Sequence, residues 1–204
     1  MPAAKINLLT LYKSEYVHSP QKPALVDIGP ALYLAVDGVG APGDAEFQDK
    51  LGALYAGAYT LKFAAKVGGR DFVVSKLEAR WGREGLADDD LLRLPKAEWP
   101  WRLAIRLPDF IGATELAAAL EQLRAKGHPG PFESLLLDQF TEGRCVQMLH
   151  VGPYENESVT IAAMREHASA QGLAWRGLHH EIYLSDPRRV EPARLKTILR
   201  RPVG

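Results

Sequence analysis

The sequence predicts an α+β protein of two similar modules, each with the element order strand–helix–strand–strand. The first observation behind this prediction is that the same order can be read twice, over about residues 22–110 and 130–204, with a helix over about 112–127 between them. The second is that "LAVDGVGAPGDAEF" and "QMLHVGPYENESV" each end a strand with glycine and proline before an acidic helix start. We therefore expect a tandem duplication of a βαββ module within a single domain that spans the chain.

In the first half, alternating apolar residues follow a polar lead-in and predict one long strand, or two, over residues 23–38. Residues 45–66 have apolar side chains at alternating steps of four and three, which predicts an amphipathic helix. Asp44 is its expected N-cap. Residues 71–81 and 101–107 are expected to be strands, separated by a charged loop that contains "ADDD".

The second half follows a helix over residues 112–126, which Thr114 is expected to cap. Residues 132–140 are compatible with a strand or with a short helix. The remaining expected elements are a strand from Gly143 to the Gly-Pro turn at 152–153, a helix over 158–171, and strands within 173–186 and 195–203.

The composition bounds the function. In 204 residues, 25 basic side chains balance 25 acidic ones, so no overall field attracts nucleic acid or an anionic membrane. No apolar run approaches the length that spans a bilayer, and no leader-like segment opens the chain. The single cysteine, Cys145, excludes an internal disulfide framework. We expect a cytoplasmic protein that binds neither nucleic acid directly nor membranes.

The stretch "HHEIYLSDP" places a carboxylate within an otherwise strand-like segment. Alternation puts His179, Glu181 and Tyr183 on one face of that strand and Ile182 on the other. Glu78 occupies the corresponding place in the first half. If antiparallel sheets carry their helices on one side, the opposite sides can form a central ligand cleft, with the two glutamates facing each other across an approximate two-fold axis.

Five stretches resemble the stand-alone GyrI-like small-molecule-binding proteins, and the resemblance runs nearly from end to end: "FQDKLGALYAGAYTLKF", "WPWRLAIRLPDF", "EGRCVQMLHVGPYENE", "HHEIYLSDPRR" and "LKTILRRPV". The resemblance implies that family's fold, a tandem pair of βαββ modules of the SHS2 type. Relatives serve as effector domains of multidrug-responsive transcription regulators, in which a glutamate in an aromatic cavity holds lipophilic cations. Other stand-alone members hydrolyse the strained cyclopropane of DNA-alkylating natural products.

One strand departs from the family pattern, which usually reads proline, leucine, glutamate, glycine, leucine and two tryptophans. Residues 76–82 keep Glu78 and Trp81 but lack the proline, the glycine and the second tryptophan. The size and shape of the ligand are therefore expected to differ, and catalysis by analogy is less secure.

The candidate residues support two chemistries. As a binding site, a glutamate supplies negative charge and aromatic rings supply flat faces for an aromatic or cationic ligand. As a hydrolase, a carboxylate activates water and a phenol donates a hydrogen bond to an oxygen that gains charge, with no metal or other cofactor. The candidate ligand-contacting residues are Glu181, Tyr183, Glu78, Trp81, Trp101, Tyr55 and His150, and the candidate catalytic residues are Glu181, Glu157, Tyr183 and Tyr154.

Structural roles remain open for several of these residues. Glu181 can be a sheet carboxylate facing solvent or a cross-strand arginine, and Glu157 can simply favour the macrodipole at a helix start. The aromatic side chains, Tyr55 in a stripe with Tyr59 and Phe63 among them, can pack in the core. His150 can be a hydrogen-bonded structural residue. The adjacent His179 and His180 point to opposite faces and lack zinc-motif spacing, so no metal site is expected.

The predicted function is binding of a lipophilic aromatic or cationic xenobiotic, with hydrolysis of a cyclopropane-containing compound as an open possibility. The alternative is a module that sequesters a protein partner, as the gyrase-inhibitor relatives suggest. That alternative requires an exposed apolar patch.

Overall fold

A computed structural model describes residues 5–16, 18–86 and 88–204. Residues 1–4 and 17 of the lead-in and residue 87 of "ADDD" lie outside the described residues. The strands are β1 (Ala24–Val39), β2 (Leu77–Trp81), β3 (Pro100–Leu107), β4 (Leu136–Val151), β5 (His179–Tyr183) and β6 (Lys196–Pro202). The α-helices are α1 (Leu8–Leu11), α2 (Ala45–Val67), α3 (Asp88–Arg93), α4 (Ala113–Ala125) and α5 (Glu157–Ser169). Short 3₁₀ helices cover Lys13–Tyr16, Lys96–Glu98, Phe132–Ser134, Tyr154–Asn156 and Pro192–Arg194.

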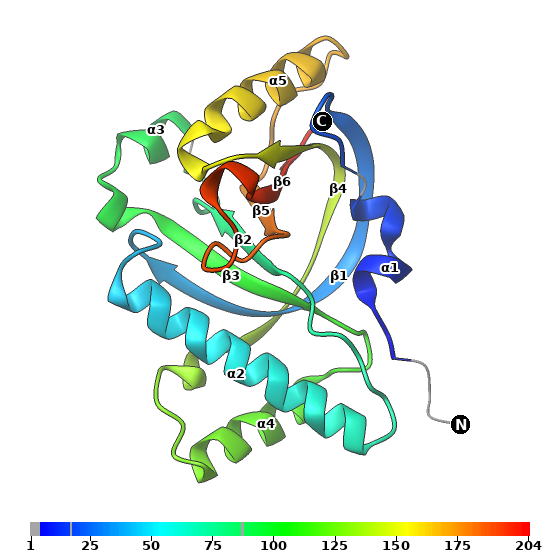
Figure 1. Cartoon of the computed structure of the whole chain (residues 1–204), viewed down its shortest axis with the longest axis vertical. Helices are drawn as coiled ribbons and strands as arrows, with labels where there is room; N and C mark the ends of the chain where they lie inside the picture. The colour runs from blue at the N-terminus through cyan, green and yellow to red at the C-terminus, as the bar shows by residue number, and fades with distance from the viewer. Residues whose placement is uncertain (1–4, 17, 87) are drawn as a thin grey trace.

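The strands form a closed antiparallel barrel in the order β1-β3-β2-β5-β6-β4 (Figure 1). The α+β class and the antiparallel pairing are confirmed, but the expected sheets close into one barrel. Exchanging β1 with β4, β3 with β6 and β2 with β5 gives the same order read in the opposite direction around the barrel. This symmetry supports the expected duplication. The duplication itself stays a prediction.

Helices cover the outer face of the barrel on two sides. In Figure 1, α2 and α4 lie against one end and α5 lies against the other, with β2 and β5 between them. The larger core joins α2 and α4 to β1 and β3 and includes Leu54, Leu61 and Ile105, each at most 1% exposed. The smaller core joins α5 to β4 and β6 through Met164 and Leu199. Burial of these apolar side chains is the main stabilising contribution of the helices.

The inner face of the barrel carries a buried charge network. His180 lies between two carboxylates, with its Nδ1 3.0 Å from Glu142 Oε1 and its Nε2 2.9 Å from Glu78 Oε2. Arg200 donates to Glu142 Oε2 at 2.9 Å and to Gln147 Oε1 at 2.9 Å. Charges this deeply buried are tolerated only when they are paired and hydrogen-bonded, and here the pairing links β2, β4, β5 and β6.

The N-terminal lead-in takes part in this network, which its polar sequence did not indicate. Arg106 of β3 donates to the Glu15 carboxylate at 2.7 Å and to the Tyr16 hydroxyl at 3.2 Å. Arg200 reaches the Glu15 carbonyl oxygen at 2.5 Å. The segment around α1 therefore belongs to the barrel, because two buried arginines need its oxygen atoms.

Three local expectations are corrected by the structure. β2 is shorter than the expected strand over 71–81, because Phe72 forms an isolated parallel bridge with Ile6 instead of joining the sheet. Helix α4 begins after Gly112, whose N–H donates to the Glu115 side chain at 2.9 Å, and Thr114 is not the cap. Two short helices, α3 and Lys96–Glu98, occupy the expected charged loop.

The other elements follow the sequence closely. Residues 24–39 form one strand, and the ambiguous stretch from residue 132 contains a 3₁₀ helix followed by the start of β4. Among the described residues, every helix is too short or too polar to cross a membrane.

The pH dependence of folding tests the inner network. Burial alone would raise the pKa of Glu142, but the charges and hydrogen bonds of His180 and Arg200 outweigh it and lower the pKa from 4.5 to about 2. This carboxylate therefore contributes stability above pH 4.5 that is lost as the pH falls towards 2. We expect Glu142→Gln to lose that acid dependence and to cost about 3–5 kcal/mol at pH 7, because it unpairs buried charges. Denaturant unfolding of both proteins between pH 2.5 and 7 measures this, and parallel acid slopes would contradict it.

Candidate functional site

Glu181 lies on the outer face of β5, in the strip of sheet between α2 and α5. The register pairs it with Ala79 of β2 and Leu199 of β6. Its side chain is buried, with the residue 8% exposed. The hydroxyl of Tyr183, two residues along the same face, donates to Glu181 Oε2 at 2.6 Å. Alternation along one short strand therefore brings the acid and the phenol together, as the sequence predicted.

A row of large side chains crosses the same face one step away. Trp81 is paired across the sheet with Trp101 on β3 and with His179 on β5. The ring of Trp101 lies against Gly38, where a Cβ atom would come within 2.1 Å of it, so only glycine fits. Trp101 also donates to the Gly40 carbonyl at 3.1 Å. Within the described part of the chain, no acceptor pairs with the buried indole N–H of Trp81.

Glu157 is the first residue of α5, and this helix brings its side chain close to His179 and Glu181. One ligand-type atom each from Glu157, His179 and Glu181 lie within 4.8 Å of one another. His179 Nε2 is 3.3 Å from Glu181 Oε1 but makes no hydrogen bond with a described residue. The buried Glu157 Oε1 likewise makes no hydrogen bond with a described residue. Burial, followed by the charges of Glu181 and Glu155, raises the pKa of Glu157 to about 9.

Two tyrosines border the carboxylates. The ring of Tyr154 meets the ring of Tyr183 edge-on, with centroids 5.9 Å apart and planes at 87°. Burial and the Glu181 charge raise the pKa of Tyr154 to about 12 and that of Tyr183 well above its ordinary value. Both phenols therefore keep their protons at neutral pH and act as hydrogen-bond donors.

Glu78 is not at this site. The register places it opposite Ile182, on the inner face, whereas Ala79 is opposite Glu181. It is 1% exposed and lies beside His180. The expectation that the two glutamates face each other is wrong. In the observed register Glu78 is one residue away from the position opposite Glu181, and a one-residue step along a strand moves a side chain to the opposite face of the sheet. The expected cleft on the sides opposite the helices is likewise filled by the barrel interior.

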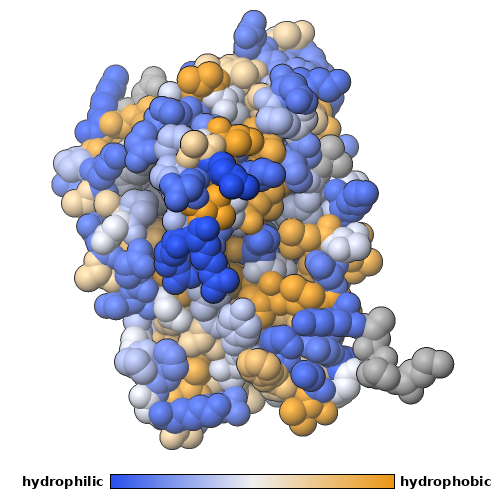
Figure 2. Space-filling view, viewed as in Figure 1, coloured by the Kyte–Doolittle hydropathy of each residue, from blue (hydrophilic) through white to orange (hydrophobic). Residues whose placement is uncertain are grey.

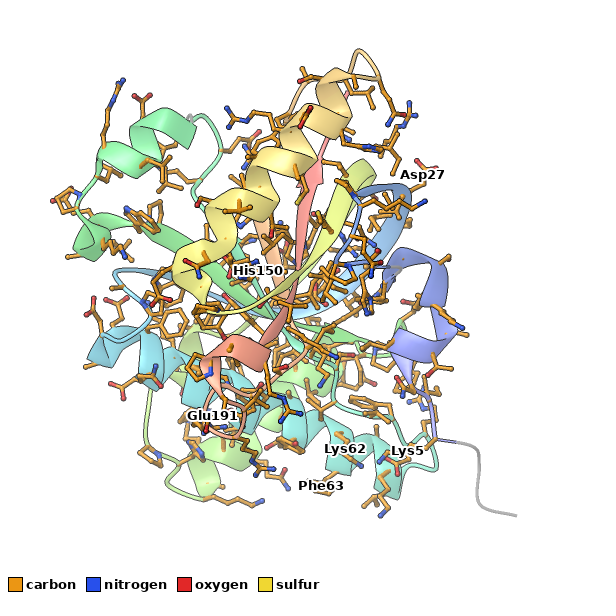
Figure 3. All side chains as sticks on the ribbon, turned by 45° about the horizontal axis from the view of Figure 1, so that its top comes forward. Lys5, Asp27, Lys62, Phe63, His150 and Glu191 are labelled. Carbon is orange, nitrogen blue, oxygen red and sulfur yellow. The ribbon has the colours of Figure 1, made fainter. Side chains whose placement is uncertain are left out.

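His150 lies on β4 near α5 (Figure 3). Its Nδ1 is 2.9 Å from the Thr160 hydroxyl of α5 and its Nε2 is 3.1 Å from the Pro153 carbonyl. One ring nitrogen contacts α5 and the other contacts the turn before it, so this side chain fixes the start of the helix that carries Glu157 instead of facing the carboxylates.

The aromatic stripe on α2 divides between two environments. Tyr55 packs against the larger core, whereas Tyr59 is 46% and Phe63 is 56% exposed. The label of Phe63 in Figure 3 lies at the edge of the molecule, away from the barrel. The charge of Asp186 contributes to raising the pKa of both Tyr55 and Tyr154. Tyr55 and Tyr183 both pack against the larger core.

The loop between β5 and β6 brings charge to the rim. Asp186 holds Arg188 at 3.0 Å and Arg189 at 3.7 Å, and both arginine side chains are largely exposed. Figure 1 shows this loop in front of β2 and β3, and Figure 2 shows strongly hydrophilic surface there. The arginines of "DPRR" thus pair locally with an acid.

Sequence reasoning did not include His179 among the candidate site residues. Its signal was present, because a histidine and a glutamate two residues apart on a strand share a face. The approach of Glu157 from α5 was not in the local pattern, since it depends on how the helix packs on β4 and β6.

The raised pKa of Glu157 predicts a measurable effect on folding. An acid whose pKa is higher in the folded state than its ordinary 4.5 costs stability as the pH rises from 4.5 towards 9. Glutamine resembles the protonated acid, so we expect Glu157→Gln to leave the melting temperature nearly unchanged at pH 4 and to raise it at pH 8. Calorimetry measures both, with the exposed Glu166→Gln on the same helix as the control. A difference that does not vary with pH would contradict the assignment.

Comparison with known proteins places the chain in a family. The model of the GyrI-like small molecule binding domain matches residues 134–203. Two crystal structures from Listeria innocua cover 98% of this chain and 100% of their own: a conserved protein at 38% identity with a TM-score of 0.89, and a hydrolase at 36% identity with a TM-score of 0.87.

The C-terminal domain of EcmrR shares the fold at 12% identity, with a TM-score of 0.56 over 90% of this chain and 97% of that one. No curated protein sequence gives a significant match. The family model and the end-to-end similarity to the Listeria structures show that this chain belongs to the GyrI-like small molecule binding domain family.

Proposed function

We propose that the protein binds a lipophilic, aromatic, cationic small molecule at Glu181. The observation that carries this proposal is a buried carboxylate without a lysine or arginine partner: among the described residues, its close polar contacts are Tyr183 and His179. A buried charge normally requires a counter-charge. A cationic ligand supplies one.

The surroundings of Glu181 suit an aromatic cation. Tyr154, Tyr183 and Trp81 present rings on the same side of the sheet, and a cation over such a ring gains about 0.5–2 kcal/mol. The indole N–H of Trp81, for which no described residue supplies an acceptor, adds a donor for a polar group on the ligand. The residue opposite Glu181 is Ala79, whose small side chain leaves space beside the carboxylate.

The potential of the site is negative. The Glu181 charge contributes to raising the pKa of Glu157, Tyr154 and Tyr183, so its field acts on these three groups. The same field attracts a cation and repels an anion of the same shape. This difference provides a test in which ring shape is held constant.

We expect rhodamine 6G, a cationic xanthene dye, to bind saturably, and fluorescein, an anionic dye with the same ring system, to bind much more weakly. Fluorescence polarisation measures both affinities. Glu181→Gln is expected to weaken rhodamine binding at least about tenfold, because it removes the partner of a desolvated charge. Glu166→Gln, which changes the charge of the molecule equally but far from the site, serves as control. Equal affinity for the two dyes, or for wild type and Glu181→Gln, would refute the proposal.

We also propose hydrolysis as a second activity, favoured by the similarity to a Listeria innocua hydrolase and by the hydrogen-bonded pair of Glu181 and Tyr183. For a cyclopropane conjugated to a carbonyl, water attacks a ring carbon and loses a proton to Glu181. The C–C bond between the attacked carbon and the ring carbon attached to the carbonyl breaks, its electron pair moves to the carbonyl oxygen as an enolate, and that enolate finally takes up a proton. A phenol such as Tyr154 or Tyr183 stabilises the oxygen as charge develops.

Hydrolysis is tested with a cyclopropane-containing DNA-alkylating compound, whose ring-opened product is followed by chromatography and mass spectrometry. We expect Glu181→Gln to lower turnover at least about 100-fold, as removal of a general base does, and Tyr183→Phe to lower it less. Binding of the compound at a one-to-one ratio without product would exclude this second activity and leave the binding function standing.

A further inference from the structure

We propose that Glu157, His179 and Glu181 form a binding site for one divalent transition-metal ion. The inference concerns the same carboxylate as the proposed ligand site, but it does not require that an organic ligand bind. It assigns a role to His179, which neither the ligand site nor the hydrolytic step uses.

The arrangement of the three side chains is that of a ligand set. One atom from each lies within 4.8 Å of the others, and the residues come from two elements, the start of α5 and the outer face of β5. His179 and Glu181 are two residues apart on the strand, so their side chains project from the same face. Ligands around a tetrahedral ion with bonds of about 2.0–2.1 Å lie about 3.3 Å from one another. His179 Nε2 and Glu181 Oε1 are already 3.3 Å apart.

An independent observation points to a missing partner. Glu157 is 8% exposed, its Oε1 is buried, and no hydrogen bond from a described residue reaches that atom. His179 Nε2 is in the same condition, although a carboxylate oxygen is near. Unsatisfied polar atoms that converge on one point in a buried site need either a cation or water. Among the described residues, no lysine or arginine pairs with either carboxylate, which favours the cation.

The neighbours of the three residues support the site. Tyr183 donates to Glu181 Oε2 at 2.6 Å, which fixes the carboxylate and leaves Oε1 directed at the shared position. Outer contacts of this kind orient metal ligands in known sites. Through its bonds to Thr160 and Pro153, His150 joins α5, the helix that carries Glu157, to the turn before it.

The ligand types indicate the class of ion. Imidazole favours Zn²⁺, Fe²⁺, Ni²⁺ or Cu²⁺ over Mg²⁺ and Ca²⁺, which prefer oxygen ligands alone. Three protein ligands leave one position of a tetrahedral ion open for water or for an oxygen atom of a small molecule. Sequence reasoning excluded a metal site because His179 and His180 point to opposite faces, and that geometry is correct. The additional ligands are carboxylates, one of them from a helix 22 residues before His179.

The test is calorimetric titration of the chelator-treated full chain with ZnCl₂ at pH 7, with MgCl₂ for comparison. We expect one saturable zinc site and no magnesium binding. His179→Gln and Glu157→Gln are each expected to weaken zinc binding at least about tenfold. The matched control is His167→Gln, which removes a half-buried histidine from α5, the helix that carries Glu157, and is expected to leave zinc binding unchanged.

X-ray absorption of the zinc-loaded wild type keeps the test independent of whether a variant folds. We expect one imidazole and otherwise oxygen ligands, at about 2.0–2.1 Å. In the titration, absence of saturable binding or equal binding by His179→Gln would overturn the inference. In the absorption spectrum, several imidazoles or a sulfur ligand would overturn it. Water would then be the partner of the three atoms.

Rhodamine 6G binding separates this inference from the proposed function. Zinc binding that fails while the dye binds overturns the metal site alone. Zinc binding that succeeds while the dye fails supports the metal site and overturns the organic-cation site.

Discussion

The pairing of His180 with Glu142 and Glu78 fixes the strand on which the site is built. This histidine is 1% exposed, and burial would lower its pKa, but the two carboxylates raise it, so the charged form is favoured in the barrel interior. A charge held inward at residue 180 forces residues 179 and 181 outward, because neighbouring side chains on a strand alternate. A slip of one residue would turn His180 outward and break its pairs with Glu142 and Glu78, which makes the register costly to change.

The two faces of β5 therefore treat charge in opposite ways. On the inner face, each acid has a basic partner: Glu142 has Arg200 and His180, and Glu15 has Arg106. On the outer face, Glu157 and Glu181 lie close together with a single histidine, and within the described residues no arginine or lysine joins them. The inner pairs stabilise the barrel, and the outer pair retains an unbalanced charge that a positively charged species can neutralise.

The sequence predicted what depends on local pattern. The period of apolar residues located α2 and α5, and alternation correctly grouped His179, Glu181 and Tyr183. Features that depend on pairing between strands far apart in the sequence could not be predicted from local pattern. Closure of the barrel requires β1 to pair with β4 and β2 with β5, and the second pairing decides that Ala79 and not Glu78 lies beside Glu181. The burial of Glu15 and Tyr16 depends on arginines about 90 and 185 residues away.

The separation of the two faces also bears on how such a domain diversifies. The outward side chains of β5 touch the site, whereas the inward ones hold the barrel closed. Mutations at positions such as Ala79, His179 and Tyr183 can therefore change what is recognised without entering the network around His180. A scaffold of this kind allows selection to act on ligand preference and on folding at different residues, so new specificities can arise while the barrel is retained.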